Sequence, residues 1–142
     1  MSAAEPPADE VPKRARLKRI LVVDDNEDNR QILIDLLSTA GYEVIEARTG
    51  FDAVVTAGRE VPDLVLMDIQ LPGMDGLEAT RRIKAQPPLA AIPVIAVTSY
   101  ALAGDERKAA DAGCDGYVTK PYSPRALLAK VRTILADAPP ET

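Results

Sequence analysis

The chain has 142 residues, of which 46% are hydrophobic and 27% charged, and its formal net charge is −5. This size and balance are typical of one globular domain. No apolar stretch approaches the ~20 residues that cross a bilayer, and the N-terminus lacks the apolar core of a secretory signal. The acidic balance disfavours nucleic-acid binding, so we expect neither nucleic acid nor membrane insertion.

Two scarce residue types exclude whole classes of site. The sequence has no histidine and a single cysteine, Cys114. Ser-His-Asp or Cys-His catalysis, a histidine-held metal and a role as phosphohistidine carrier are therefore excluded, and structural zinc is disfavoured. A lone cysteine forms no internal disulfide, which fits the reducing cytoplasm where we expect the protein to act. Any metal should be a hard cation held by oxygen.

The N-terminal segment differs in composition from the rest of the chain. Residues 1–17 carry Pro, Ala and charge without periodicity, so we expect a flexible arm there. The basic cluster "KRARLKR" could touch an acidic partner or a membrane surface, but a solvated tail is the favoured interpretation. We expect the folded domain at 18–137 and a short tail at 138–142.

Beyond the arm, strand-like apolar runs alternate with helical patterns. The strand-like runs cover 20–23, 42–47, 64–67, 93–97 and 116–118. The second run contains Glu43 and Glu46 and is the most polar, so we expect it at an edge of the sheet. Strands alternating with helices predict an α/β fold with a parallel sheet, whose active crevice lies beyond the carboxyl ends of the strands.

The helical patterns differ in clarity. Residues 27–40 place four large apolar residues on one face and stop at Gly41; these residues are Ile32, Leu33, Leu36 and Leu37. Residues 75–85 and the mostly polar 105–112 also have helical spacing, whereas 50–59 is short and ambiguous. Ser123 is a good N-cap for the last helix, with Pro124 at its first position.

Polar residues follow four of the predicted strands. Asp24 and Asp25 follow the first strand, Asp68 the third, Thr98 the fourth and Lys120 the fifth. Each alone has a bland explanation, as a helix cap, a β-former or a solvated charge. Together, three carboxylates at one edge would repel one another unless a cation lies between them, and Mg²⁺ is the natural choice for oxygen ligands.

The same edge suits phosphoryl transfer, in which catalysis is chiefly positioning and charge neutralisation. Asp68 would be the nucleophile and form an aspartyl phosphate. Lys120 adds a mobile positive charge and Thr98 a hydrogen-bond donor for the phosphoryl oxygens.

Four stretches of the sequence resemble the receiver domain of two-component response regulators: "ILVVDDNEDNR", "DLVLMDIQLPGMDGLEATRRIK", "IPVIAVTSYA" and "DGYVTKPYS". They occur in order at the right spacing and cover roughly residues 19–136. The resemblance implies a CheY-like, flavodoxin-like fold: a five-stranded parallel sheet of order 2-1-3-4-5 with helices on both faces. It also implies that the Lys120–Pro121 bond is cis.

The resemblance further implies a role for each residue of the edge. Asp68 is the phosphoacceptor, and Thr98 and Lys120 hold the phosphoryl group. Thr98 also acts in the switch, with Tyr117 as its aromatic partner. Four residues form the Mg²⁺ site. Asp25 and Asp68 bind the ion through their side chains and Gln70 through its backbone carbonyl, whereas Asp24 acts mainly through water.

The resemblance also implies the partners. A histidine kinase or a histidine phosphotransfer protein would supply the phosphoryl group, and the protein would catalyse only its own phosphorylation and dephosphorylation. The stretch "AVTSYALAGDERKAADAGCDGYVTKPYS" is especially similar to cell-cycle regulators that consist of a receiver alone. We therefore expect a single-domain regulator, a monomer or weak dimer, that contacts an unknown protein through helix 105–112, strand 116–118 and the last helix. Ser99 replaces the usual alanine of the family.

Three other functions are less compatible with the sequence. A flavin-binding electron carrier would need a Ser/Thr/Gly-rich phosphate loop after the first strand, where this chain has "DDNEDNR". A haloacid-dehalogenase-type phosphatase would need a D-x-D arrangement, which Asp24-Asp25-Asn26 does not provide. A DNA-binding regulator would need a helix-turn-helix domain after residue 136.

Overall fold

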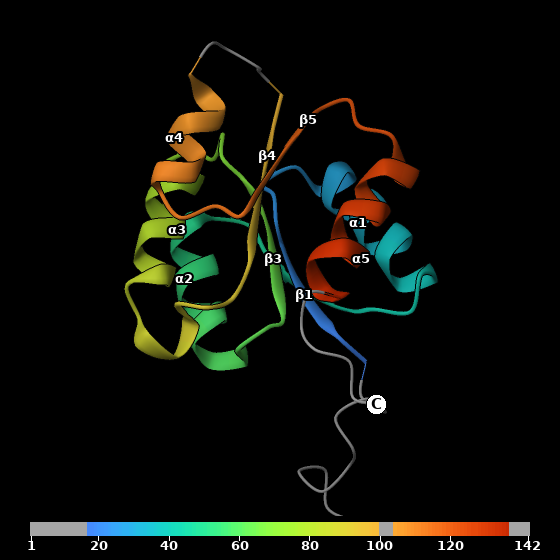
Figure 1. Cartoon of the computed structure of the whole chain (residues 1–142), viewed down its shortest axis with the longest axis horizontal. Helices are drawn as coiled ribbons and strands as arrows, with labels where there is room; N and C mark the ends of the chain where they lie inside the picture. The colour runs from blue at the N-terminus through green and yellow to red at the C-terminus, as the bar shows by residue number, and fades with distance from the viewer. Residues whose placement is uncertain (1–16, 100–103, 137–142) are drawn as a thin grey trace, which may run out of the picture.

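The computed structural model describes residues 17–99 and 104–136, and these residues build a three-layer α/β fold. Its core is one sheet of five parallel strands in the order β2-β1-β3-β4-β5 (Figure 1). The strands are β1 (Arg19–Val23), β2 (Glu43–Ala47), β3 (Leu64–Asp68), β4 (Val94–Thr98) and β5 (Gly116–Thr119). The predicted fold class and strand order are thus confirmed.

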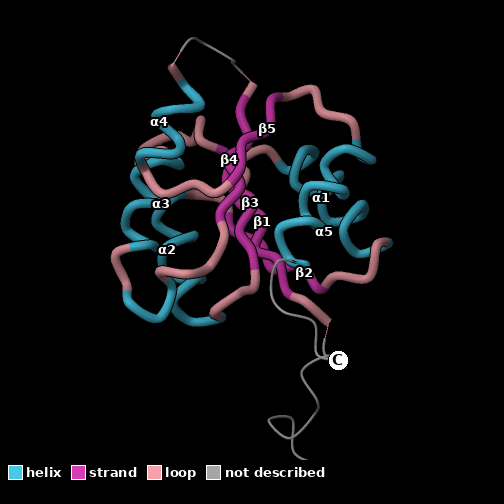
Figure 2. Tube along the Cα trace, in the orientation of Figure 1, coloured by secondary structure: helices cyan, strands magenta, loops and turns pink. Residues whose placement is uncertain are grey.

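Helices cover both faces of the sheet. The helices are α1 (Glu27–Thr39), α2 (Gly50–Glu60), α3 (Gly76–Lys84), α4 (Asp105–Asp111) and α5 (Pro124–Ala136), with a short 3₁₀ turn, η3 (Pro87–Leu89). Helices α1 and α5 lie on one side of the strands and α2, α3 and α4 on the other (Figures 1 and 2). Because all strands are parallel, their carboxyl ends lie at the same edge of the sheet, next to the loops that lead into the following helices.

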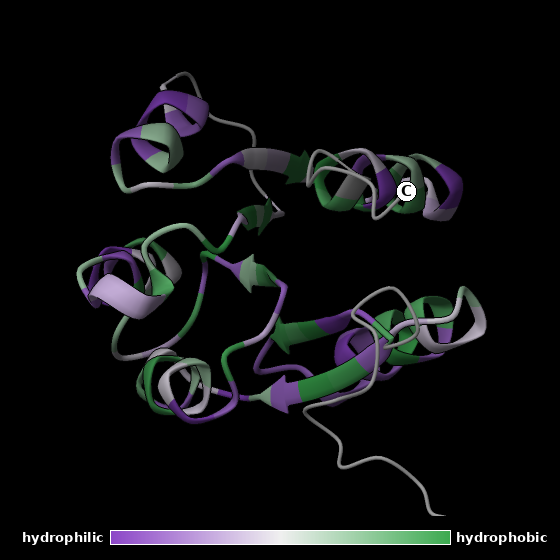
Figure 3. Cartoon of the chain, turned by 60° about the horizontal axis from the view of Figure 1, so that its bottom comes forward, coloured by the Kyte–Doolittle hydropathy of each residue, from purple (hydrophilic) through white to green (hydrophobic). Residues whose placement is uncertain are grey.

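Burial follows the position of each strand. Every residue of β3 and β4 is buried, because helices cover both of their faces. Strand β2 is only partly buried and lies at the edge, as its glutamates predicted. The strands are largely green in the hydropathy view, whereas purple gathers on the outer surfaces of the helices (Figure 3).

Side chains fix the start of most helices. Asn26, Thr49 and Asp75 each accept a hydrogen bond from a backbone N–H in the first turn of α1, α2 and α3. Ser123 Oγ accepts one from Ala126 N at 3.2 Å, which confirms the predicted cap of α5. Gly41 has a φ of 101°, a conformation that favours glycine at the end of α1.

The structure resolves one ambiguous helix, adds one turn and corrects one expectation about burial. The ambiguous segment 50–59 is the well-formed helix α2, and the turn η3 was not anticipated. Ile32, expected on the buried face of α1, is 56% exposed, because it lies beside the stripe formed by Leu33 and Leu37. The proposed tail, and the arm apart from Leu17, lie outside the described residues. No helix in the described ranges is long and apolar enough to cross a membrane.

Candidate functional site

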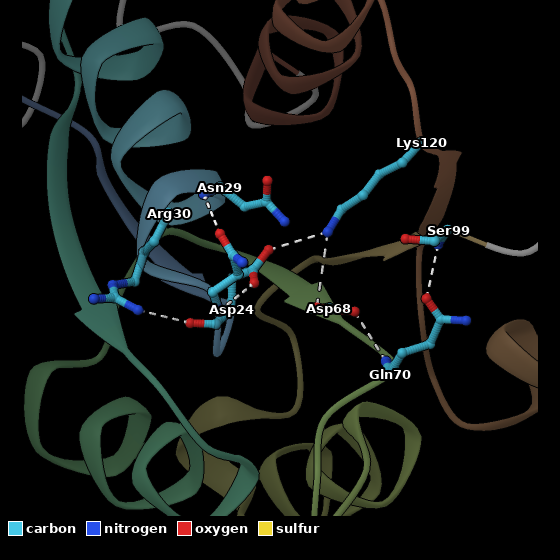
Figure 4. A network of polar contacts seen from close by, with 8 residues as sticks. Asp24, Asn29, Arg30, Asp68, Gln70, Ser99 and Lys120 are labelled. Atoms are coloured by element: carbon cyan, nitrogen blue, oxygen red, sulfur yellow. Dashed lines mark hydrogen bonds and ion pairs between the residues drawn. The ribbon is translucent and has the colours of Figure 1, made fainter.

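The carboxyl edge of the sheet brings together the polar residues that the sequence singled out. Asp68 is the last residue of β3 and Thr98 the last of β4. Asp24 and Asp25 directly follow β1, and Lys120 directly follows β5. Because all strands are parallel, these ends meet at one edge (Figure 4). The site is therefore built from four strands that are distant in sequence and adjacent in space.

Three carboxylates form a compact group at this edge. One oxygen from each of Asp24, Asp25 and Asp68 lies within 4.8 Å of the other two. Asp24 and Asp68 are buried, whereas Asp25 is exposed. Clustered carboxylate oxygens are the donors that a hard divalent cation prefers, so the group fits Mg²⁺ in the chemistry of its ligands.

The amine of Lys120 reaches across the sheet into the carboxylate group. Lys120 Nζ lies 3.1 Å from Asp24 Oδ2 and 3.8 Å from Asp68 Oδ2. Its side chain is 17% exposed, so water screens these contacts only in part. The peptide bond that follows Lys120 is cis, as the resemblance implied.

Every polar group of Asp24 is engaged within the protein. Its N–H donates to the Ala47 carbonyl at 3.2 Å, and its own carbonyl accepts from Arg30 Nη1 at 2.9 Å. Asp24 Oδ1 accepts from Asn26 N at 2.9 Å, and Oδ2 pairs with Lys120. Asp24 is thus held firmly, with less capacity for a direct metal bond than Asp25, whose carboxylate has no hydrogen-bond or ion-pair partner among the described residues.

The surroundings of Asp68 disfavour its charged form. Burial raises the pKa of Asp68 above its ordinary value, and the charges of Asp24 and Asp25 act in the same direction. A hydrogen bond of 2.9 Å from Gln70 N to Asp68 Oδ1 and the charge of Lys120 oppose this rise without cancelling it. A cation or an incoming electrophile at this carboxylate would relieve that cost.

The loops after β3 and β4 are tied to each other next to Asp68. Gln70 Oε1 accepts a hydrogen bond of 2.8 Å from Ser99 N (Figure 4). Ser99 follows Thr98, which is 1% exposed and whose carbonyl accepts from Lys120 N. The Gln70 side chain therefore joins the loop of the predicted phosphoacceptor to the chain that leads into α4.

Tyr117 lies one residue inside β5, away from the carboxylate group. Burial raises the pKa of the Tyr117 hydroxyl, and the carboxylates of Asp105 and Glu106 act in the same direction. Tyr117 also borders a cleft of about 200 Å³ between α4, β5 and α5. The predicted switch residue thus lies where these three elements meet.

Arg30 is a contributor to this site that the sequence reasoning missed. Its guanidinium is buried, with Nη1 donating to the Asp24 carbonyl and Nε paired with Glu46 Oε1 at 2.9 Å. A signal was present in the sequence, because Arg30 shares one helical face with Leu33 and Leu37. A basic residue within an apolar stripe indicates a buried partner.

With this geometry established, comparison with known proteins identifies the family. The family model described as "Response regulator receiver domain" matches residues 20–132. The chain belongs to the response regulator receiver family, a family of signalling domains in two-component systems. The family that matches this chain is thus neither the flavin carriers nor the phosphatases considered above.

Individual relatives agree with the family assignment. The polar-differentiation response regulators DivK of Brucella ovis and Brucella anthropi are each 43% identical over 121 residues, which is 85% of this chain and 98% of DivK. The expected similarity to DivK and its relatives is therefore confirmed.

Solved structures share the fold. CheY4 of Vibrio cholerae matches with a TM-score of 0.80 at 27% identity, covering 84% of this chain and 99% of CheY4. The receiver domain of a Pseudomonas aeruginosa sensor histidine kinase matches with a TM-score of 0.79 at 36% identity, covering 84% of this chain and 98% of that domain. That Pseudomonas structure has a magnesium ion coordinated in its active-site cleft.

Proposed function

We propose that this protein is a single-domain response regulator whose phosphoacceptor is Asp68. The observation that carries the proposal is the position of Asp68 at the end of β3, with two further carboxylates within 4.8 Å and the Lys120 amine at 3.8 Å. The receiver would occupy residues 18–137, between an arm at 1–17 and a tail at 138–142. Its catalysis would be limited to its own phosphorylation and dephosphorylation.

The phosphoryl donor would be the phosphohistidine of a histidine kinase or of a phosphotransfer protein. A carboxylate oxygen of Asp68 attacks phosphorus while the phosphorus–nitrogen bond breaks, and the bonding electrons stay on that nitrogen, so the ring, protonated at its other nitrogen, leaves as neutral imidazole. Lys120 and Thr98 would then neutralise and hydrogen-bond the phosphoryl oxygens. Burial of Asp68 supports the nucleophilic role, because its carboxylate is poorly solvated.

The acidic group would hold Mg²⁺ during this reaction. Asp25, Asp68 and the Gln70 carbonyl would be direct ligands, and Asp24 would act mainly through water. This division is supported by Asp25, whose exposed carboxylate has no polar partner among the described residues, and by Asp24, whose polar groups are all engaged. A bound Mg²⁺ would supply charge neutralisation for the phosphoryl group and the carboxylates.

The signal would leave through the surface of the receiver. Support comes from the DivK proteins, 98% of whose length this chain matches, and from the cleft that borders Tyr117 on the face of α4, β5 and α5. We propose that phosphorylation controls binding of a protein partner there, and that the receiver acts in the cytoplasm as a monomer or weak dimer. Thr98 and Tyr117 would carry the change from the phosphoryl group to this face.

The test is phosphorylation of purified protein by acetyl phosphate, or by a phosphorylated kinase, in the presence of Mg²⁺. Asp68→Asn should abolish hydroxylamine-labile labelling. Asp111→Asn, which neutralises an exposed carboxylate on α4, should label like the wild type. Full labelling of Asp68→Asn would show that another carboxylate is the acceptor.

A further inference from the structure

Arg30 is the only basic residue that is buried in the described part of the chain. It is 3% exposed, although it belongs to α1, whose other charged residues face solvent. A buried guanidinium is costly unless it is paired and hydrogen-bonded. The partners of Arg30 therefore indicate which structural role this buried cation has.

The guanidinium connects the edge strand to the loop that carries the acidic residues. Arg30 Nε lies 2.9 Å from Glu46 Oε1 on β2, and Nη1 donates to the Asp24 carbonyl at 2.9 Å. Glu46 is 52% exposed, so water stabilises its charge, whereas the bond to Asp24 is buried. Figure 4 shows the Arg30 side chain pointing at the Asp24 backbone from the side opposite Lys120.

The bond to Asp24 fixes a whole peptide unit. A peptide group is planar, so holding the Asp24 carbonyl oxygen also orients the N–H and Cα of Asp25. The Asp25 carboxylate itself is exposed and has no polar partner among the described residues. The backbone of Asp25 sets the direction of its Cα–Cβ bond, and Arg30 fixes this backbone together with the hydrogen bond from Asn26 N to Asp24 Oδ1.

We propose that Arg30, anchored by Glu46, is a positioning residue of the acidic site that sets the direction of Asp25 for a divalent cation. The inference rests on the proposed function, in which Asp25 is a direct Mg²⁺ ligand. The positive charge of Arg30 cannot itself favour Mg²⁺ binding, because a cation near the site repels Mg²⁺. The paired Glu46 carboxylate offsets that repulsion and leaves the positioning of Asp25 as the main effect.

The test separates geometry from charge with a double variant of unchanged net charge, Arg30→Met with Glu46→Gln. It removes the anchor and the bond to Asp24 together. Mg²⁺ binding, measured by calorimetry well below the melting temperature, should weaken by about 10-fold, the loss typical of groups that orient metal ligands. The Mg²⁺-induced shift of the Asp25 amide signal in NMR spectra should also change.

Two single variants serve as controls. Glu46→Gln keeps a neutral acceptor for Arg30 Nε but removes the charge that offsets the guanidinium, so it measures the electrostatic contribution, and its loss of Mg²⁺ affinity should be smaller than that of the double variant. Arg30→Lys keeps the charge but has no planar fork to bond Glu46 and Asp24 at once, so its affinity should lie between those of the wild type and the double variant. If the double variant unfolds, Arg30→Lys is the deciding protein, and its wild-type affinity would overturn the proposal.

A folded double variant with wild-type Mg²⁺ affinity and an unchanged Asp25 signal would show that Arg30 only stabilises the fold. Asp25→Asn distinguishes this failure from a failure of the metal site. If Asp25→Asn loses Mg²⁺ binding while the double variant keeps it, the role of Arg30 alone is wrong. If Asp25→Asn binds like the wild type, Asp25 is not a ligand, and both the metal assignment and the role of Arg30 are wrong.

Discussion

Lys120 and Asp24, 96 positions apart in the chain, form an ion pair of 3.1 Å at the carboxyl edge of the sheet. The two residues follow β5 and β1, which are separated in the sheet by β3 and β4. The long lysine side chain spans this distance above Asp68. Among the described residues, Lys120 is therefore the cation that forms ion pairs with this carboxylate group.

Replacing this cation should make the fold depend on metal. Lys120→Met keeps most of the side-chain volume but removes the ion-pair partner of the buried Asp24 carboxylate. Without Mg²⁺ we expect the free energy of unfolding to fall by about 1.5–3 kcal/mol, the range for hydrogen bonds to charged groups. Urea denaturation measures this loss, and added Mg²⁺ should recover more stability in the variant than in the wild type. The exposed Lys130→Met serves as control, and equal losses in the two variants would contradict the expectation.

Stability should also depend on the protonation of Asp68. Its pKa is raised by burial, so the folded chain binds this proton more readily than the unfolded chain does. Stability therefore falls as pH rises from the ordinary pKa of the carboxyl group to the raised one, and the full cost is present above that window. At neutral pH without Mg²⁺, Asp68→Asn should be more stable than the wild type.

The pH series provides the control for this prediction. The advantage of Asp68→Asn should shrink as the pH is lowered, because both states of the wild type become protonated at that carboxyl group. Mg²⁺ at neutral pH should also shrink it by stabilising the ionised wild type. Urea unfolding at acidic and neutral pH measures both effects. A variant less stable than the wild type at neutral pH would show that the contact with Lys120 outweighs the burial of Asp68.

The acidic residues after β1 should differ in their importance for Mg²⁺. Asp25→Asn should weaken binding by about 10-fold or more, since it removes the charge of an expected direct ligand. Asp24→Asn should have a smaller effect, because Asp24 is engaged by Asn26 and Lys120 and would act through water. Calorimetric titration measures both affinities, and equal losses would reject the ranking.

The edge of the sheet was predictable because strand ends can be read from the sequence. A buried apolar run that stops at a charged residue, such as the run ending at Asp68, marks both the strand and its end. Parallel topology then places all these ends together. The second strand was likewise recognisable as an edge strand, because a strand covered on both faces of the sheet has no exposed position for charged residues such as its two glutamates.

The expectations that were wrong or missing depended on tertiary contacts. Helix α2 was ambiguous because its large residues, Phe51 and Val55, are exposed while the small Ala53 and Ala57 pack in the core. A helical face chosen by its large apolar residues is therefore the exposed face, and the buried face is formed by small ones. Arg30 was missed because its partners, Glu46 and the Asp24 carbonyl, come from two other segments of the chain.

The last prediction concerns the route from Asp68 to the output face. Helix α4 is the element best suited to move, because it is seven residues long and Ala109 is the only residue it buries. Tyr117 lies beside the start of this helix and borders the cleft between α4, β5 and α5. A phosphoryl group on Asp68 would draw Thr98 toward it and so change the space available to the Tyr117 ring.

Contacts of the phosphoryl group with Thr98 and Lys120 would exist only in the modified protein, so they can shift an equilibrium between two surfaces. Hydrogen bonds to charged groups contribute about 1.5–3 kcal/mol each, and about 1.4 kcal/mol changes an equilibrium tenfold. A shift of about 10- to 100-fold is therefore expected. It should be visible in amide NMR spectra recorded with and without beryllofluoride, which stands in for the phosphoryl group, as changes that extend from Asp68 to residues 105–118.

Two variants of Thr98 test whether its hydroxyl carries this change. Thr98→Ala removes the donor and should confine the beryllofluoride-induced changes to the surroundings of Asp68. Thr98→Ser keeps the hydroxyl and should preserve most of the distant changes, so a loss due only to repacking around this buried side chain would be recognised. If the changes never reach residues 105–118 in the wild type, or if they persist there in Thr98→Ala, the signal does not pass through Thr98 and Tyr117.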